Sequence, residues 1–310
     1  MGKRICYIVG AGGSCAYDLP NGKQLVEQMM ELRGQGTTPE ERHEQFARLR
    51  ARLTAANPDS IDEYIQELSE AGHDSQSQLK ASAAYGVAVV LLRAQLKHEI
   101  TNKRPDDWLY HLTRRYRKNL MTLADPPEIS FITFNYDLLI EHHLKHRLFG
   151  LLADDEKAEA RLNQIPIIHY HGQLGPVVYP APKPGTTGLQ ISRYAYERMT
   201  DVQDDSAYES SKSLRFFWET DSNSEMHEKA VRVLGSAEEI AVLGVGRAMD
   251  PMLSLLGALP ARWWQGGRFH MSIYGLGDDA QVRVKQFVNE KGGTPLLQRM
   301  KASEFIQSLS

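Results

Sequence analysis

The sequence predicts an α/β fold with a Rossmann-like, mostly parallel sheet and helices on both faces. Two observations predict it. Short apolar runs alternate with segments of helical period, as in repeated strand–helix units. Most of the runs also end in glycine or in polar residues, which marks where strands stop. A third observation adds a feature to this class: about a hundred residues of helical pattern separate the first run from the second.

The elements follow in chain order. Strands are expected at about residues 4–9, 129–134 and 165–170, and then in "EEIAVLGVG" and "RFHMSIYGLG". Capping residues followed by glutamates begin helices at Thr38 and Ser60, and "AYGVAVVLLRAQLKHEI" is apolar enough for a buried helix. We therefore expect residues 1–310 to form a single domain, with residues 24–126 as a helical insertion within it.

Composition restricts the function. The 310 residues are 42% hydrophobic and 24% charged, as in globular proteins, and the net charge of −3 gives no reason to expect nucleic-acid or membrane binding. Cys6 and Cys15 are too few for a disulfide framework or a cysteine-rich metal site. The N-terminus runs into a strand without a signal-like apolar stretch, so a reduced, cytoplasmic protein is expected.

Polar and glycine residues gather where the predicted strands end, the edge at which open parallel sheets bind ligands. Glycines allow a ligand to approach the backbone, and free amides can hold phosphates. One Asn, one Asp and one His would then project into the same crevice, which indicates a nucleotide site with a small polar reaction centre. The residues are Gly10, Ala11, Gly12, Gly13, Ser14, Thr133, Asn135, Asp137, His171, Gly244, Gly246, Asp250 and Gly275.

Each of these features also has a structural explanation. The glycine-rich turn could serve only the fold, and His171 could be a buried histidine with satisfied hydrogen bonds. Asp137 and Asp250 could cap helices, and Asn135 could close an Asx turn. Their coincidence at several strand ends is what favours a site.

Together the motifs resemble the sirtuin superfamily, and more closely the zinc-less sirtuin-like NAD hydrolases of bacterial antiphage systems. "GAGGSCAYDLPNGKQL", which includes Pro20, resembles the family's glycine–serine loop, and "TFNYD" is similar to its Thr-x-Asn-x-Asp motif. "HYHG" resembles the catalytic His-Gly, and "LGVGRAMDPM" resembles a Gly-x-Ser-x-x-Asp-Pro segment in which Gly246 replaces the serine. The two Cys-x-x-Cys pairs of the deacylases' zinc ribbon are missing.

The resemblance implies an NAD glycohydrolase that uses NAD as a substrate and no metal. Asn135 would bind the ribose or position water, Asp137 would orient the nicotinamide amide or support the cationic sugar, and His171 would act as general base. The amides of residues 10–14 would hold the pyrophosphate. Self-association or a separately encoded partner, such as a hexameric ATPase, would control the activity, with the helical insertion as the contact surface.

Other readings of the sequence are open. The chain could be a deacylase or an ADP-ribosyltransferase, although the missing cysteines count against deacylation, or a non-catalytic sensor of NAD or ADP-ribose. His142 and His146 could bind metal, but neighbouring charges favour a solvated helix face. Trp263 and Trp264 are expected to pack beside a turn rather than to bind a partner. Tyr194 and Tyr196 could close over a nucleotide or pack in the core.

Overall fold

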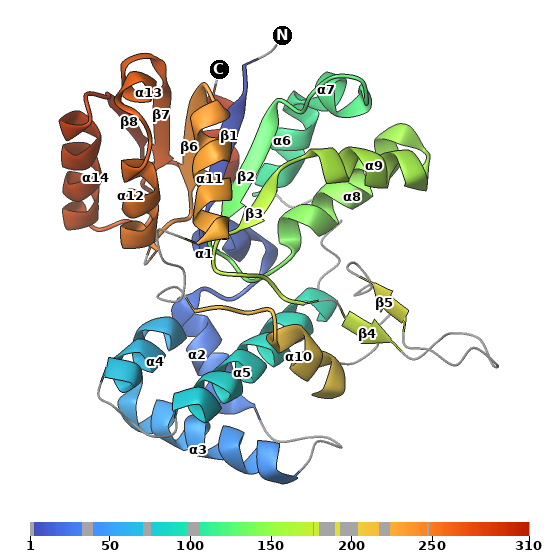
Figure 1. The fold of residues 1–310 in the computed structure, drawn as a ribbon, viewed down its shortest axis with the longest axis vertical. Coiled ribbons are helices and arrows are strands. Elements are labelled where there is room, and N and C mark those ends of the chain that lie inside the picture. The colour runs from blue at the N-terminus through green and yellow to red at the C-terminus, as the bar shows by residue number, and fades with distance from the viewer. Residues whose placement is uncertain are drawn as a thin grey trace. The chain divides into compact units, whose positions relative to one another are not determined.

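The computed structural model of the chain describes residues 3–32, 40–70, 76–97, 106–175, 177–179, 190–192, 204–216, 224–246 and 248–309 (Figure 1). These residues form two compact units. The first unit combines residues 1–17, 100–170 and 220–310, and the second combines residues 18–99 and 171–219. The predicted insertion at residues 24–126 does not coincide with the second unit, because residues 100–126 belong to the first.

A six-stranded parallel sheet forms the centre of the first unit, in the order β3-β2-β1-β6-β7-β8. This is the strand order of a doubly wound Rossmann sheet, in which the order reverses next to the first strand. The predicted α/β class is therefore confirmed. The strands are β1 (Ile5–Val9), β2 (Ile129–Thr133), β3 (Ile167–His169), β6 (Glu239–Leu243), β7 (Arg268–Ser272) and β8 (Pro295–Gln298).

Both faces of β1 are covered, which explains why its sequence is continuously apolar. On one face Tyr7 stacks on Phe131 and its hydroxyl lies 3.2 Å from that of Tyr116, at the end of a helix. On the other face Cys6 and Ile8 belong to a core built with further helices. The strand is thus fixed from both sides, and its carboxyl end is a rigid platform.

The helices of this unit surround the sheet (Figure 1). The core on the Cys6 face includes residues of α11 (Glu225–Ser236), α12 (Met249–Gly257) and α14 (Asp278–Glu290). The helix whose end contacts Tyr7 is α6 (Trp108–Arg115), and α15 packs against it. The remaining elements are α1 (Ala11–Ser14), the 3-10 turn η1 (Cys15–Tyr17), α7 (Arg117–Met121), α8 (Leu139–Leu152), α9 (Asp155–Gln164), α13 (Ala261–Gly266) and α15 (Ala302–Ser308).

The second unit is mainly helical. Its long helix α5 packs against the four other helices that the structure describes in this unit, and its middle is buried as predicted. Asn21 and Gln24 form a reciprocal capping box at the start of α2. The elements are α2 (Gly22–Glu31), α3 (Glu40–Ala56), α4 (Ile61–Glu70), α5 (Gln76–Lys97), β4 (Val177–Tyr179), β5 (Gln190–Ser192) and α10 (Asp204–Ser211). Within the described residues of both units, no helix is long and apolar enough to cross a membrane.

Candidate functional site

Two glycine turns meet at the point where the strand order reverses. The amide of Gly10, after β1, donates to the Leu243 carbonyl, and the Gly12 amide donates to the Gly244 carbonyl, each over 3.0 Å. A Cβ on Gly10 would lie 2.5 Å from the Gly244 oxygen, and Gly244 has a φ of +66°. Glycine is therefore required at both positions, for close backbone approach at the first and for conformation at the second.

The first turn is helical rather than the loop expected from its glycines. Residues Ala11–Ser14 form the single helical turn α1. The amides of Gly10, Gly12 and Gly13 all donate to backbone carbonyls, and the Trp108 indole donates to the Gly13 carbonyl over 2.8 Å. The hydrogen bonds of these glycines thus hold the turn in place and aim the buried Ser14 side chain at the end of β2.

A hydrogen-bonded chain joins the predicted residues that follow β1 and β2. The Asn135 side-chain amide donates to the Ser14 hydroxyl over 2.9 Å and to the Gly10 carbonyl over 3.2 Å. The Ser14 hydroxyl in turn donates to the Asp137 carboxylate over 3.0 Å. Thr133 supports the chain, because its hydroxyl accepts the Asn135 backbone amide over 3.0 Å.

One side-chain atom of Asn135 takes no part in this hydrogen-bond network. Both donor bonds come from its side-chain nitrogen, whereas its side-chain oxygen Oδ1 has no hydrogen-bond partner among the described residues. The residue is only 7% exposed, and a buried acceptor without a partner costs about 1–3 kcal/mol. An orphaned acceptor at the switch point of the sheet is suited to a ligand hydroxyl or a water.

Asp137 lies close to the start of α8 but is not its N-cap. The N-cap is Leu138, and the second carboxylate oxygen of Asp137 accepts the Leu139 amide over 3.1 Å. Burial raises the pKa of Asp137, while the bonds from Leu139 and Ser14 act in the opposite direction. Its two oxygens are both engaged, so the carboxylate is held in one orientation.

A buried ion pair that the sequence analysis missed lies beneath Asn135. His169, the last residue of β3, has Nδ1 2.9 Å from the Asn135 backbone carbonyl oxygen and Nε2 2.7 Å from the Glu141 carboxylate of α8. Because a carbonyl only accepts, Nδ1 carries a proton. Burial lowers the pKa of His169, but the Glu141 carboxylate, together with the hydrogen bond to Asn135 and the charge of Asp137, outweighs burial and the pKa is raised. The signal was present in "HYHG", where a second histidine occurs two residues before His171.

His171 belongs to the second unit, as does Pro20, whereas Asn135 and Asp137 belong to the first. Whether His171 joins these residues therefore stays a prediction. His171 is buried, and its backbone carbonyl accepts the Arg215 amide over 3.0 Å. Burial lowers its pKa to about 4, which keeps the imidazole neutral near pH 7.

The remaining predicted residues differ in their surroundings. A Cβ on Gly246 or Gly275 would meet no atom within 4 Å, so both positions have open space. Asp250 does not cap α12; its exposed carboxylate pairs with Arg283 of α14. The three positions therefore differ from the tightly packed turn formed by Gly10 and Gly244.

The structure also bears on the residues considered as alternative metal or partner sites. The expectation that α8 presents its histidines to solvent is wrong for His142 and His143, which are buried. No group of three or more potential metal ligands occurs among the described residues. Trp263 and Trp264 are buried in the core, which confirms that they pack rather than form a partner surface. Tyr194 and Tyr196 lie outside the described residues.

Comparison with known proteins finds sirtuins among solved structures. A Sir2 homolog in complex with NAD is 15% identical, over 99% of this chain and 88% of that one, with a TM-score of 0.48. A Sir2 bound to an inhibitor, 2'-O-acetyl-ADP-ribose and a deacetylated peptide is 14% identical, over 98% and 91%, with a TM-score of 0.36. With TM-scores below 0.5, these likenesses establish neither family nor activity. No protein-family model and no curated protein matches the chain.

Proposed function

We propose that the chain hydrolyses NAD to nicotinamide and ADP-ribose. The observation that carries the proposal is the orphaned side-chain oxygen of Asn135, buried at the switch point of a Rossmann sheet. The switch point is where such sheets bind nucleotides, and a hydrogen-bond acceptor is what a ribose hydroxyl or an attacking water requires. The resemblance of "TFNYD" and "HYHG" to sirtuin motifs supports the same reading.

The chemistry needs few groups, because NAD carries its own leaving group. The bond between the ribose carbon and the pyridinium nitrogen breaks, its electron pair neutralises the nicotinamide ring, and no general acid is required. A water oxygen then bonds the ribose carbon, and the proton it loses passes to a base. In this proposal Asn135 holds the ribose or the water, and Asp137 orients the nicotinamide amide or supports the positive charge developing on the sugar. His171, neutral near pH 7, accepts the proton.

The pyrophosphate would lie along the two glycine turns. The amides of Gly10, Gly12 and Gly13 already donate to backbone carbonyls, so they would contribute close approach rather than free donors. The space around Gly246 and Gly275 is open at the ends of β6 and β7. The proposed NAD-binding set therefore remains residues 10–14, Pro20, Thr133, Gly244, Gly246, Asp250 and Gly275.

Incubation of the purified chain with NAD alone tests the proposal. Chromatography should detect nicotinamide and ADP-ribose in equal amounts, and Asn135→Ala and His171→Ala should each reduce the rate at least a hundredfold. Asn163→Ala, at an exposed asparagine of α9, is the matched control and should retain parental activity. Near-parental turnover in a folded Asn135→Ala variant would contradict the assignment. Nicotinamide release only with an acylated peptide or another ADP-ribose acceptor would identify a transferase instead.

A non-catalytic sensor is the second candidate, and one observation favours it. Ser14, Asp137 and the Asn135 nitrogen already satisfy one another, as expected of a rigid binding surface. A sensor would bind NAD or ADP-ribose without releasing nicotinamide. Calorimetric binding of NAD with no product over a day, at protein concentrations up to those at which the chain self-associates, would favour this candidate over a hydrolase activated by assembly.

We further propose that the hydrolase serves antiphage defence by depleting NAD, as the family resemblance implies. A hydrolase that was always active would exhaust the cell's own NAD. Control would therefore come from self-association or from a separately encoded partner, for which a hexameric ATPase is one candidate class. Residues of the predicted insertion, 24–126, would supply the contact surface.

A further inference from the structure

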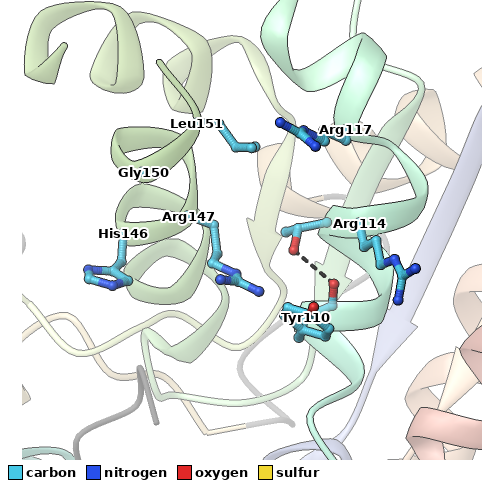
Figure 2. Close-up of a pocket in the computed structure, with 8 residues that line it drawn as sticks. Tyr110, Arg114, Arg117, His146, Arg147, Gly150 and Leu151 are labelled. Atoms are coloured by element: carbon cyan, nitrogen blue, oxygen red, sulfur yellow. Dashed lines mark hydrogen bonds between the residues drawn. The ribbon is translucent and has the colours of Figure 1, made fainter. Parts of the chain in front are cut away.

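A basic pocket lies in the first unit, on residues to which the proposed function assigns no role. Its volume is about 340 Å³, and α6, α7 and α8 form its walls (Figure 2). The lining residues are Tyr110, Thr113, Arg114, Arg117, His146, Arg147, Gly150 and Leu151. None of them belongs to the Asn135–Ser14–Asp137 chain or to the glycine turns.

Two guanidinium groups face the space from opposite walls. Figure 2 shows Arg117 extending from α7 and Arg147 from α8, while Arg114 and His146 flank the pocket. The lining includes no carboxylate. Among the ion pairs of the described residues, none involves Arg114, Arg117 or Arg147. In a chain with a net charge of −3, this hollow thus gathers positive charge that no ion pair between described residues offsets.

One of these arginines is held in place before any ligand arrives. The Arg147 guanidinium lies over the Tyr110 ring, 4.3 Å from its centroid, in a cation–π contact. The Thr113 hydroxyl donates to the Tyr110 carbonyl over 3.0 Å, within the turn of α6 that carries this ring. A pre-oriented guanidinium loses less entropy on binding an anion, which favours affinity.

The chemistry of the lining selects an anion of a particular kind. Guanidinium groups bind phosphate oxygens through two parallel hydrogen bonds, and two facing groups match two phosphates or one phosphate and a second acidic group. The volume lies at the small end of the range of about 300–1,000 Å³ that ligand pockets span. The Tyr110 ring and Leu151 offer apolar surface for a compact organic part.

We propose that this pocket binds a small phosphorylated molecule carrying at least two negative charges. The inference is independent of NAD cleavage, because it concerns residues outside the strand-end site. The negative net charge of the chain disfavours a long nucleic acid as the ligand.

Isothermal titration calorimetry with inorganic pyrophosphate and adenosine 5'-diphosphate tests the proposal on the full chain. We expect both probes to bind, and Arg117→Gln and Arg147→Gln each to weaken binding about tenfold or more, because each removes a charge-assisted contact. Lys118→Gln is the matched control: it removes one exposed positive charge from the same helix but does not line the pocket. Its affinity should stay within about twofold of the parent.

Diphosphate could also enter the strand-end site, so Asn135→Ala is titrated in parallel. Binding that Asn135→Ala abolishes and the arginine variants leave intact would assign the probes to that site and overturn the proposal. Equal affinities of the parent, Arg117→Gln and Arg147→Gln would overturn it too. The proposal would also be overturned if neither probe bound at about 1 mM. It would likewise be overturned if the affinity for oligonucleotides kept rising with their length, past the length that the pocket can hold.

Discussion

The imidazole of His169 lies between the Asn135 backbone carbonyl and the Glu141 carboxylate, 2.9 Å from the first and 2.7 Å from the second. Through the bond to the Asn135 backbone, the pair fixes the residue that carries the orphaned acceptor. His169 and Glu141 are thus positioning residues for Asn135.

Replacing Glu141 with Gln should remove the charge that stabilises the imidazolium. We expect kcat for NAD to fall while KM changes little, and the free energy of unfolding near pH 6 to fall by about 3 kcal/mol. Because folding raises the pKa of His169, the stability that the pair contributes is fully present below about pH 6.5, the pKa of histidine in the unfolded chain. This contribution is lost as the pH rises through the pKa of His169 in the folded protein. Urea denaturation from pH 6 to pH 9 should show this loss in the parent and not in Glu141→Gln. Glu156→Gln, at an exposed glutamate of α9, is the control.

The two kinds of glycine at the strand ends should respond differently to substitution. Gly244→Ala introduces a Cβ at φ +66° against the first turn, so we expect a loss of at least about 2 kcal/mol in stability. Gly246→Ser enters open space and should change stability by no more than about 0.5 kcal/mol. By the family resemblance the new hydroxyl should lower KM for NAD. Thermal melts and initial rates measure both, and a similar loss in the two variants would contradict the distinction.

His143 should make the protein sensitive to acid. Burial lowers its pKa from 6.5 to about 4, so the unfolded state binds the proton more readily. Stability should therefore fall as pH drops from about 6.5 to about 4, by up to roughly 3 kcal/mol from this residue. His143→Gln should flatten the dependence, whereas His111→Gln, at a half-buried histidine of α6, should leave it in place. Equal pH dependence of the parent and His143→Gln would refute the assignment.

Metal content is predicted to be low. Cys6 is buried in β1 and Cys15 lies in η1, and two cysteines cannot complete a four-ligand zinc site. Elemental analysis of protein purified without an affinity tag should find well under one zinc per chain, and chelator should not shift the melting temperature. A zinc that co-purifies at one per chain would reopen His142 and His146 as ligands.

Specific activity should depend on assembly. If self-association controls the proposed hydrolase, turnover per chain should rise with protein concentration in step with mass from light scattering. If a separate partner controls it, the isolated chain should stay slow at every concentration. Full activity from a monomer throughout the series would exclude both forms of control.

Much of the fold could be predicted because a buried strand or helix has a recognisable pattern of apolar residues in the local sequence. The sequences of β1 and β2 are apolar runs because both faces of these strands are covered. The long apolar helix α5 was expected to be buried, and its middle is buried. β8 was missed because Pro295–Gln298 is short, begins with proline and lies partly exposed at the sheet edge. Residues 171–219 form one unit with residues 18–99 through contacts between segments far apart in the sequence. The local hydrophobic pattern of a sequence does not predict such contacts.

The candidate site could be predicted only in part. Ser14, Asn135 and Asp137 were identified from their places after strands, and they do lie together. The Glu141–His169 pair was missed because a glutamate inside a helix and a histidine inside a strand look ordinary until the elements pack. Lys145 and Arg147 suggested a solvated helix, yet His142 and His143 on the same helix are buried.

Helix α8 runs from the strand-end network to the basic pocket. Glu141 bonds His169 near its start, and Arg147, six positions later and so about 9 Å along the axis, forms part of the pocket wall. If an anion held at Arg147 shifted α8, the affinity for NAD would change by some factor, and thermodynamic reciprocity requires that NAD change the affinity for the anion by the same factor. The chain would then report one metabolite's concentration through its response to another.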